Sequence, residues 1–206
     1  TLFVFKEKDL GVVMQDNLKV DKQCNKAANS ANAMLGIIRR NFINRSKDVV
    51  MPLYKSIVRP HLDYCVQAWR PHLRKDIDRL ERVQRRATKL VEGLENMTYD
   101  ERLKRVGLSS FEDRMRRADL IEVYKILHGL DKVDADKLFT RSWTGTKGNS
   151  FKLFKRRFRL DVGKFSFGNR VCQEWNDLPE EVVSAETLLT FKVRLDKHLR
   201  TYRGYI

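Results

Sequence analysis

The sequence has few of the residues and motifs that mark several common protein classes. Its cysteines, Cys24, Cys65 and Cys172, are too few and too far apart for a disulfide framework or a CxxC zinc site. Each lies in an apolar helical pattern, so we expect three buried free thiols. No GxxxxGK[ST] or GxGxxG phosphate-binding loop occurs, and no local arrangement of Ser, Cys and His is typical of a nucleophilic site. These absences argue against an enzyme activity that resides in this chain alone.

Long apolar runs are also absent. A helix needs roughly 18 or more apolar residues to cross a bilayer, and no stretch approaches that length. The first nine residues are too short for the apolar region of a signal peptide. We therefore expect a soluble, intracellular protein, and 42% hydrophobic residues in a chain of 206 are enough for a globular core.

Potential metal ligands lie near one another in the sequence at His61, Asp63, Cys65 and His72. On a helix the two side chains of an HxD pair point about 200° apart. This spacing argues against a metal site. We predict neither metal ligands nor catalytic residues in this chain.

What the chain does have is positive charge. Its 42 lysines and arginines exceed its 27 acidic residues, which gives a formal net charge of +15. An imbalance of this size makes a polyanion the expected partner. Nucleic acid is the first choice, and a membrane surface is the second.

We expect residues 53–71 to form the buried centre of a helical bundle, because apolar residues recur there at helical spacing on both sides of Pro60. Proline has no backbone N–H, so the helix should bend near Arg59 or Pro60, and Pro71 should end it. The positions expected to be buried are Leu53, Ile57, Val58, Leu62, Cys65, Val66 and Trp69.

The surrounding patterns predict a mainly α fold. Residues 1–20 alternate imperfectly around a KEKD turn, which predicts a β-hairpin. Thr98 and Glu101 form a predicted capping box. The composition changes after Gly129, which indicates a small basic C-terminal domain, mixed or helical, over 131–206. Helices are expected over residues 21–41, 72–92, 98–106, 110–128, 165–176 and 187–199.

The predicted helix 72–92 is highly charged and supplies the first candidate binding surface. Its cations lie largely opposite its apolar residues. One interpretation is a solvated helix face. The other is a helix that contacts phosphates, because clustered arginines bind phosphate oxygens in a bidentate geometry. The candidate residues are Arg79, Arg82, Arg85, Arg86 and Lys89.

The second candidate surface lies between residues 141 and 164. This stretch contains eight basic residues and one acidic residue, so it supplies +7 of the net charge. The run FKLFKRRFRL interleaves phenylalanines with cations, a combination that allows unpaired bases to stack while phosphates are neutralised. In the alternative interpretation, Phe151, Phe154 and Phe158 pack on the core and the cations only cover it. The candidate residues are Lys152, Lys155, Arg156, Arg157 and Arg159.

Several segments carry a resemblance to a known family. They read EKDLGVVMQDNLKVDKQCNKAANSANAMLGIIRR, YKSIVRPHLDYC followed by WRP, DIDRLERVQRRATKLV, YDERLKRVGLSSFEDRMRRADLIEVYKILHG and FGNRVCQEWNDLP. Together they span nearly the whole chain. They resemble the part that follows the palm in the reverse transcriptases of LINE-type (non-LTR) retrotransposons, in the jockey-like clade.

This resemblance implies a palm-edge hairpin remnant at 1–20, a thumb-like helical bundle at 21–130 and a C-terminal domain at 131–206. In the family the thumb closes on the template–primer duplex. The implied partners are therefore RNA, RNA/DNA duplex, and the upstream palm, fingers and endonuclease regions that this chain lacks, with no membrane. The implied compartments are the nucleus and the cytoplasm.

The same resemblance places the catalytic carboxylates and their Mg²⁺ ions in the upstream palm, whose Tyr/Phe-Ala-Asp-Asp box does not occur here. We expect no cofactor in this chain, although Mg²⁺ is implied for the full-length polymerase, and we expect the chain alone to be inactive. Some relatives carry a C-terminal zinc knuckle, which this chain lacks. The second hypothesis is a decayed or host-recruited helical module that binds protein and has no catalytic role.

Overall fold

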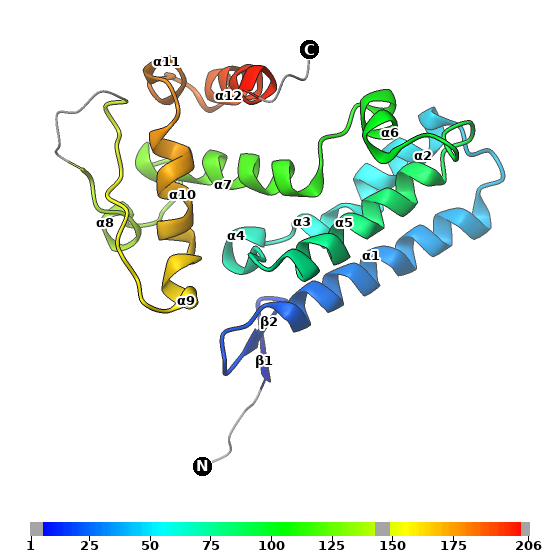
Figure 1. Ribbon diagram of the computed structural model, residues 1–206, viewed down its shortest axis with the longest axis horizontal. Helices are drawn as coiled ribbons and strands as arrows, with labels where there is room; N and C mark the ends of the chain where they lie inside the picture. The colour runs from blue at the N-terminus through cyan, green and yellow to red at the C-terminus, as the bar shows by residue number, and fades with distance from the viewer. Residues whose placement is uncertain (1–5, 143–148, 203–206) are drawn as a thin grey trace. The chain divides into compact units, whose positions relative to one another are not determined.

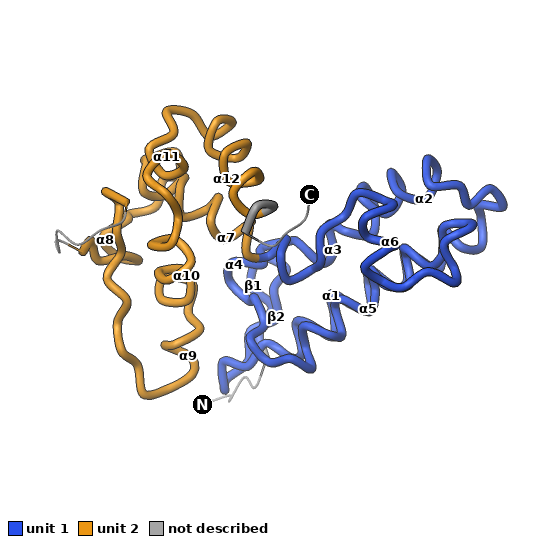
Figure 2. The backbone as a smooth tube through the Cα atoms, turned by 45° about the horizontal axis from the view of Figure 1, so that its top comes forward, with its two compact units in different colours: residues 1–115 blue, residues 116–206 orange. Residues whose placement is uncertain are grey.

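The computed structural model describes residues 6–142 and 149–202, and over these residues the fold is mainly helical with a two-stranded antiparallel hairpin (Figure 1). The chain divides into two compact units, Thr1–Met115 and Arg116–Ile206 (Figure 2). This division falls inside helix α7 (Phe111–Leu127), whereas the sequence analysis placed a domain boundary after residue 130. The reason is that the later apolar residues of α7 belong to the core of the second unit. No helix in the described part of the chain is both long and apolar enough to span a membrane.

The hairpin consists of β1 (Lys6–Asp9) and β2 (Val12–Gln15). The prediction that the KEKD segment forms the turn is wrong, because these four residues form strand β1. The chain turns instead at Leu10 and Gly11, which both have positive φ, as many two-residue hairpin turns require. The strand expected over residues 1–5 lies outside the described residues.

The hairpin is attached to helices of unit 1 by buried side chains and hydrogen bonds. Val12 and Val13 are buried, and the Val13 N–H donates to Gln23 Oε1 at 2.9 Å. The Tyr64 hydroxyl donates to the Leu10 carbonyl at 2.8 Å. A two-stranded hairpin is marginal by itself, so these contacts account for its order.

Helices α1 (Asp21–Asn41) and α5 (Arg74–Lys89) pack side by side in unit 1 (Figure 1). The first has the predicted bounds, and the second is shorter at both ends than the expected 72–92. Small side chains on the packed face allow the two backbones to approach. The buried apolar residues of α1 are Cys24, Ala27, Ala28, Ala31, Leu35 and Ile38.

The central segment leaves the regular α-helical pattern where Pro60 predicts it, but the form differs from a single bent helix. The elements there are α2 (Lys47–Leu53), the π-helical turn η1 (Tyr54–Val58), α3 (Pro60–Asp63) and α4 (Val66–Trp69). The Arg59 N–H donates to the Tyr54 carbonyl at 2.8 Å, five residues back. The wider turn accommodates the missing N–H of Pro60.

Two residues expected to be buried in this segment are exposed, so these predictions are wrong. The π turn shifts the phase of the helix, so Tyr54 and Val58 are buried and Ile57 faces outward. Cys65 adopts a φ of 52°, which breaks the pattern between α3 and α4 and leaves its thiol exposed. Trp69 is buried as predicted, and its indole N–H donates to the Tyr64 carbonyl at 2.8 Å.

Helix α6 (Tyr99–Val106) begins with the predicted capping box. The Glu101 N–H donates to Thr98 Oγ1 at 3.4 Å, and the Thr98 N–H donates to the Glu101 carboxylate at 2.8 Å. The helix ends at Gly107, whose φ of 68° suits glycine. The Thr98 hydroxyl also donates to the Glu101 carboxylate, at 2.7 Å, and the hydrogen bonds from the Thr98 hydroxyl and N–H hold the pKa of Glu101 below its ordinary value.

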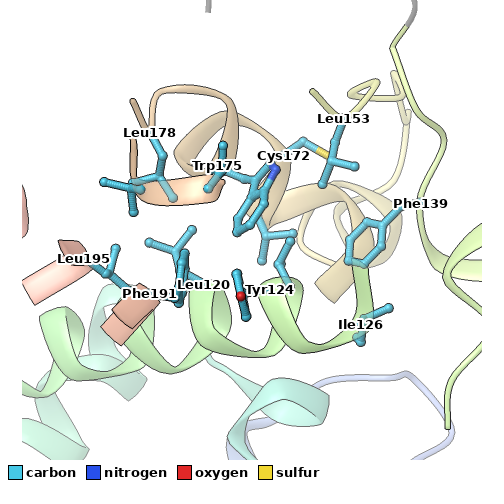
Figure 3. Packing of buried hydrophobic residues seen from close by; sticks show 14 of the residues in the cluster. Leu120, Tyr124, Ile126, Phe139, Leu153, Cys172, Trp175, Leu178, Phe191 and Leu195 are labelled. Atoms are coloured by element: carbon cyan, nitrogen blue, oxygen red, sulfur yellow. The ribbon is translucent and has the colours of Figure 1, made fainter. Parts of the chain in front are cut away.

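The core of unit 2 surrounds Trp175, which is fully buried as expected (Figure 3). Tyr124 of α7 stacks on Phe191 with ring centroids 4.2 Å apart, and the Tyr124 hydroxyl donates to the Ala185 carbonyl at 2.6 Å. The helix expected over 165–176 is present but begins two residues later, because the chain turns at Phe165 and Ser166. Beyond α7, this unit contains α8 (Ala135–Leu138), α9 (Asp161–Lys164), α10 (Phe167–Asn176), α11 (Glu180–Val183) and α12 (Leu188–Tyr202).

Candidate nucleic-acid interface

Helix α5 has two faces of different chemistry. One face is buried and carries Leu80, Val83 and Ala87. On the rest of the helix lie the five cations that the sequence analysis named, and we call this group the α5 surface. It consists of Arg79, Arg82, Arg85, Arg86 and Lys89, all exposed except Arg79, which is half-buried.

Buried hydrogen bonds fix the rotation of α5 within unit 1. Gln84 is fully buried, and its Oε1 accepts from the Tyr54 hydroxyl at 2.8 Å and from Arg114 at 2.6 Å. Its Nε2 donates to the Ser109 carbonyl at 2.8 Å and to the Tyr99 hydroxyl at 3.0 Å. All four hydrogen-bonding positions of the amide are therefore used. Because an unpaired buried polar group is costly, this arrangement disfavours any rotation of the helix.

Glu81 extends the same network by one turn. Its carboxylate is buried and accepts from the Phe111 N–H at 2.9 Å, at the beginning of α7, and from the Tyr99 hydroxyl. Burial and the hydrogen bond to Glu81 raise the pKa of Tyr99 well above its ordinary value. Burial also raises the pKa of Tyr54 to about 12. Both hydroxyls therefore remain protonated donors at neutral pH.

Arg114 closes the network with a charge. Its guanidinium is buried and donates to Asp63 at 3.0 Å. Burial by itself would lower the pKa of Arg114, but the neighbouring Asp63 carboxylate raises it above its ordinary value. Asp63 also accepts from Arg59 at 2.8 Å. A pair of this kind costs several kcal/mol to break, because a buried charge would lose its partner.

The members of the α5 surface differ in their own contacts. Arg79 donates to the buried Asp76 at 2.8 Å, so part of its charge is neutralised. Arg85 lies over the Tyr99 ring, 4.2 Å from its centroid, and Arg86 donates to Asn32 of α1 at 3.1 Å.

Arg82 and Lys89 are the two members of this surface most clearly directed to solvent. Arg82 donates to the carbonyl of Asp78, one turn before it, at 3.2 Å, and Lys89 is exposed. The exposed Lys75 continues the row at the other end, although it was not among the candidate residues. The sequence does indicate that Lys75 belongs to this row, because it lies four residues before Arg79, about one helical turn away.

The second surface is an extended segment, residues 149–160, which we call the basic strap. It runs beside α10, turns at α9 and leads back into α10 (Figure 1). The Leu153 N–H and carbonyl pair with the side-chain amide of Asn176, both at 2.8 Å. The Trp175 indole N–H donates to the Phe151 carbonyl at 2.9 Å, so the first half of the strap is fixed to α10.

Asn149 provides a further anchor that the sequence analysis did not name. Its side-chain amide is buried and donates to the carbonyls of Trp175 at 3.0 Å and Leu178 at 3.1 Å. Ser150 adds two bonds to the Glu180 carboxylate, at 2.6 and 2.7 Å. These partners are more than 20 residues apart in the sequence, so no local pattern identifies them.

The structure separates the candidate cations of the basic strap into two kinds. Lys152 is half-buried, whereas Lys155, Arg156, Arg157 and Arg159 are exposed. Arg156 donates to Thr140 Oγ1 at 2.8 Å. All five lie on one segment of unit 2, while the α5 surface belongs to unit 1.

The potential metal ligands do not form a cluster. Within residues 6–142 and 149–202, no three His, Cys, Asp or Glu side chains meet in a way that could hold a metal ion. Asp63 is engaged by Arg59 and Arg114 instead. Cys65 and His72 are exposed.

Comparison with protein-family models, with curated proteins and with solved structures gives no match for this chain.

Proposed function

We propose that this chain binds the phosphate backbone of an RNA/DNA duplex through the α5 surface, as the thumb and C-terminal part of a LINE-type reverse transcriptase of the jockey-like clade. The observation that carries the proposal is the row of exposed cations Arg82, Arg86 and Lys89 on a helix whose other face is fixed by buried hydrogen bonds. A rigid helix that presents cations at turn spacing suits contacts with phosphates.

The spacing of the row supports this ligand. Lys89 lies 14 positions after Lys75, which corresponds to about 21 Å along a helix axis. Several phosphates of one duplex fit within that length. The α5 surface offers no exposed aromatic ring, since Arg85 covers Tyr99. Contacts of this kind position a protein on nucleic acid without reading its sequence.

The sequence resemblance supplies the context of the proposal. In such a polymerase the thumb holds the template–primer duplex behind the active site, and the Mg²⁺ ions belong to the palm. The proposed partners are therefore RNA, RNA/DNA duplex and the upstream regions. The proposed compartments are the nucleus and the cytoplasm, where element RNA is made and copied.

The proposal is tested by the double variant Arg82→Gln with Lys89→Gln. These two side chains make few contacts within the protein, so the fold should be retained. We expect weaker binding to an RNA/DNA duplex, and a plot of log K against log salt whose slope is smaller by about 0.9 for each lost phosphate contact. Binding is measured by fluorescence anisotropy at several salt concentrations.

The matched control carries the same charge change elsewhere in unit 1, as Lys55→Gln with Arg105→Gln, both at exposed positions. We expect this control to retain the slope of the unmodified chain more closely than the test variant does. If both variants weaken binding equally, only the net charge matters, and the α5 surface is not the binding site.

A helical module that binds protein is the second candidate function. The observation that favours it is on α12, where Leu189 is 73% exposed and Val193, one turn later, is 63% exposed. Apolar contact would be insensitive to salt, whereas phosphate binding weakens steeply as salt rises. Partner binding that persists at high salt and disappears in Leu189→Ser with Val193→Ser would favour this module.

A further inference from the structure

The second half of the basic strap exposes two aromatic side chains. Phe154 is 55% exposed and Phe158 is 39% exposed, and no helix or strand forms over residues 154–158. Exposed phenylalanines forgo most of the stabilisation that full burial of the side chain would give. Two of them within five residues suggest a partner surface rather than a packing function.

The Phe158 ring is held in place from one side. It lies directly against the backbone of Gly163 in α9, where a Cβ atom would come within 2.4 Å of Phe158 Cδ1 and 2.6 Å of its Cγ. Glycine is therefore needed at position 163 for the ring to occupy this place. One part of the ring is supported by α9, and the remainder is available to a ligand.

Phe154 is fixed through its backbone. Its N–H donates to the Thr140 carbonyl at 2.7 Å, directly after the anchored Leu153. Arg156, between the two rings, donates to the hydroxyl of the same threonine at 2.8 Å. An ordered backbone lowers the entropic cost of binding, because less freedom is lost when a ligand arrives.

The charges around the rings identify the ligand. Lys155, Arg157 and Arg159 are exposed and alternate with Phe154, Arg156 and Phe158 along the strap, and no acid interrupts residues 150–160. An aromatic ring can stack on a base only when that base is unpaired, and the neighbouring cations neutralise the phosphates. A duplex offers only phosphates to such a segment, so it would leave both rings unused.

We infer that the basic strap is a binding site for single-stranded nucleic acid, in which Phe154 and Phe158 stack on unpaired bases and Lys155, Arg157 and Arg159 contact the backbone. This site lies in unit 2 and takes a different ligand from the α5 surface. It does not depend on the duplex-binding proposal. In a protein that copies RNA, it would hold unpaired template or another single-stranded segment.

The first test replaces the rings and keeps every charge, as Phe154→Leu with Phe158→Leu. The probes are a 12-nucleotide oligouridine RNA and a 12-base-pair RNA/DNA duplex, measured with the full chain. We expect oligouridine affinity to fall at least about tenfold, because stacking contributes roughly 1–3 kcal/mol per base. The salt slope and the duplex affinity should not change.

The control is Phe42→Leu in unit 1, a phenylalanine of similar exposure, at 38%, outside the strap. It should change neither affinity. Equal loss of oligouridine and duplex binding in the strap variant would overturn the inference, as would no loss at all. Thermal unfolding of each variant establishes that the comparison is made between folded proteins.

A second variant, Gly163→Ala, tests whether the position of the Phe158 ring matters for binding. It keeps both phenylalanines and all charges, but the new methyl group must displace Phe158. We expect weaker oligouridine binding with an unchanged salt slope. Unchanged affinity would show that the position of the ring is irrelevant and would contradict the inferred site.

A lipid surface is the alternative ligand for the same segment. A third probe distinguishes lipid from single-stranded nucleic acid. Vesicles containing phosphatidylserine serve as the third probe. If Phe154→Leu with Phe158→Leu abolishes vesicle binding and leaves oligouridine binding intact, the inference is wrong. The Arg82→Gln and Lys89→Gln variant distinguishes this result from failure of the proposed function, since it should affect only the duplex.

Discussion

Cys65 differs from the other two cysteines in a way that chemistry can measure. Its thiol is exposed, whereas Cys24 and Cys172 are buried. Burial raises the pKa of Cys24 to about 12 and also raises the pKa of Cys172. Because the thiolate is the reactive form, buried thiols with a raised pKa react slowly.

We therefore expect Ellman's reagent to modify one thiol per native chain, and peptide mass spectrometry to locate it at Cys65. Cys24 and Cys172 should react only after denaturation. Cys65→Ser is the control and should leave no fast thiol. Rapid modification of Cys24 in the native protein would contradict its place in the core of unit 1.

Trp69 tests the core assignment at the centre of unit 1. The ring is buried and its N–H is hydrogen-bonded, so Trp69→Ala should lower the free energy of unfolding by about 3–5 kcal/mol. Urea denaturation measures the change. Ile43→Ala, at an almost fully exposed position of the same unit, should change it by no more than about 0.5 kcal/mol. A loss at Trp69 as small as that of the control would contradict its burial.

The sequence predicted apolar burial well at individual residues but not polar burial. Trp69 and Trp175 lie in regular apolar patterns, and both are buried. Gln84 lies on a charged helix, and nothing local indicates that it is fully buried. Its partners, such as Tyr54 and Ser109, are 25 to 30 residues away, so only the fold brings them together.

Among the helices, α10 shows how closely two elements of unit 2 pack. A Cβ atom on Gly168 would lie 2.5 Å from the Leu138 carbonyl oxygen at the end of α8. We expect Gly168→Ala to destabilise unit 2 by about 1–3 kcal/mol, because the backbone cannot yield without losing contacts. Urea denaturation, monitored by tryptophan fluorescence, measures the change in the free energy of unfolding.

Gly36→Ala in α1 is the matched control, since its Cβ would meet only the end of the Arg40 side chain, at 3.6 Å. Alanine favours a helix over glycine by roughly 1 kcal/mol, so this variant should be slightly more stable. If both variants change stability in the same direction, the close approach of α8 and α10 does not determine which side chain position 168 can hold.

Elements with local end signals were predicted accurately, and elements shaped by distant contacts were not. Thr98, Glu101 and Gly107 mark the ends of α6, and the structure has that helix where the sequence predicts it. The π turn η1 has no signal beyond Pro60, because its form depends on which side chains the core accepts. The basic strap is held by Asn149 and Asn176, whose partners lie in other segments.

At the scale of the whole chain, the sequence predicted a mainly helical protein with a small hairpin and a basic C-terminal part. It did not indicate that α7 belongs to both units, because a continuous helix has no break in its pattern at Met115. Nor could the sequence show which cations form ion pairs within the protein. Arg79 and Arg82 look alike in the sequence, but only Arg79 donates to a buried carboxylate.

The two basic surfaces, with five named cations each, offer different chemical groups to a ligand. The α5 surface offers cations without exposed rings, and the basic strap offers cations with Phe154 and Phe158. We therefore propose that charge determines how tightly the chain binds nucleic acid, and that the rings determine the preference for unpaired bases. This division predicts that one set of variants changes the salt slope and the other does not.

The most direct measurement is the salt dependence of duplex binding by the unmodified chain. If the exposed cations of α5 contact phosphates, the plot of log K against log salt for an RNA/DNA duplex should be linear. Its slope should be about −3.6 to −4.5, since each of four or five contacts contributes roughly −0.9. A slope near zero, with affinity retained at high salt, would contradict the proposal that α5 binds the phosphate backbone.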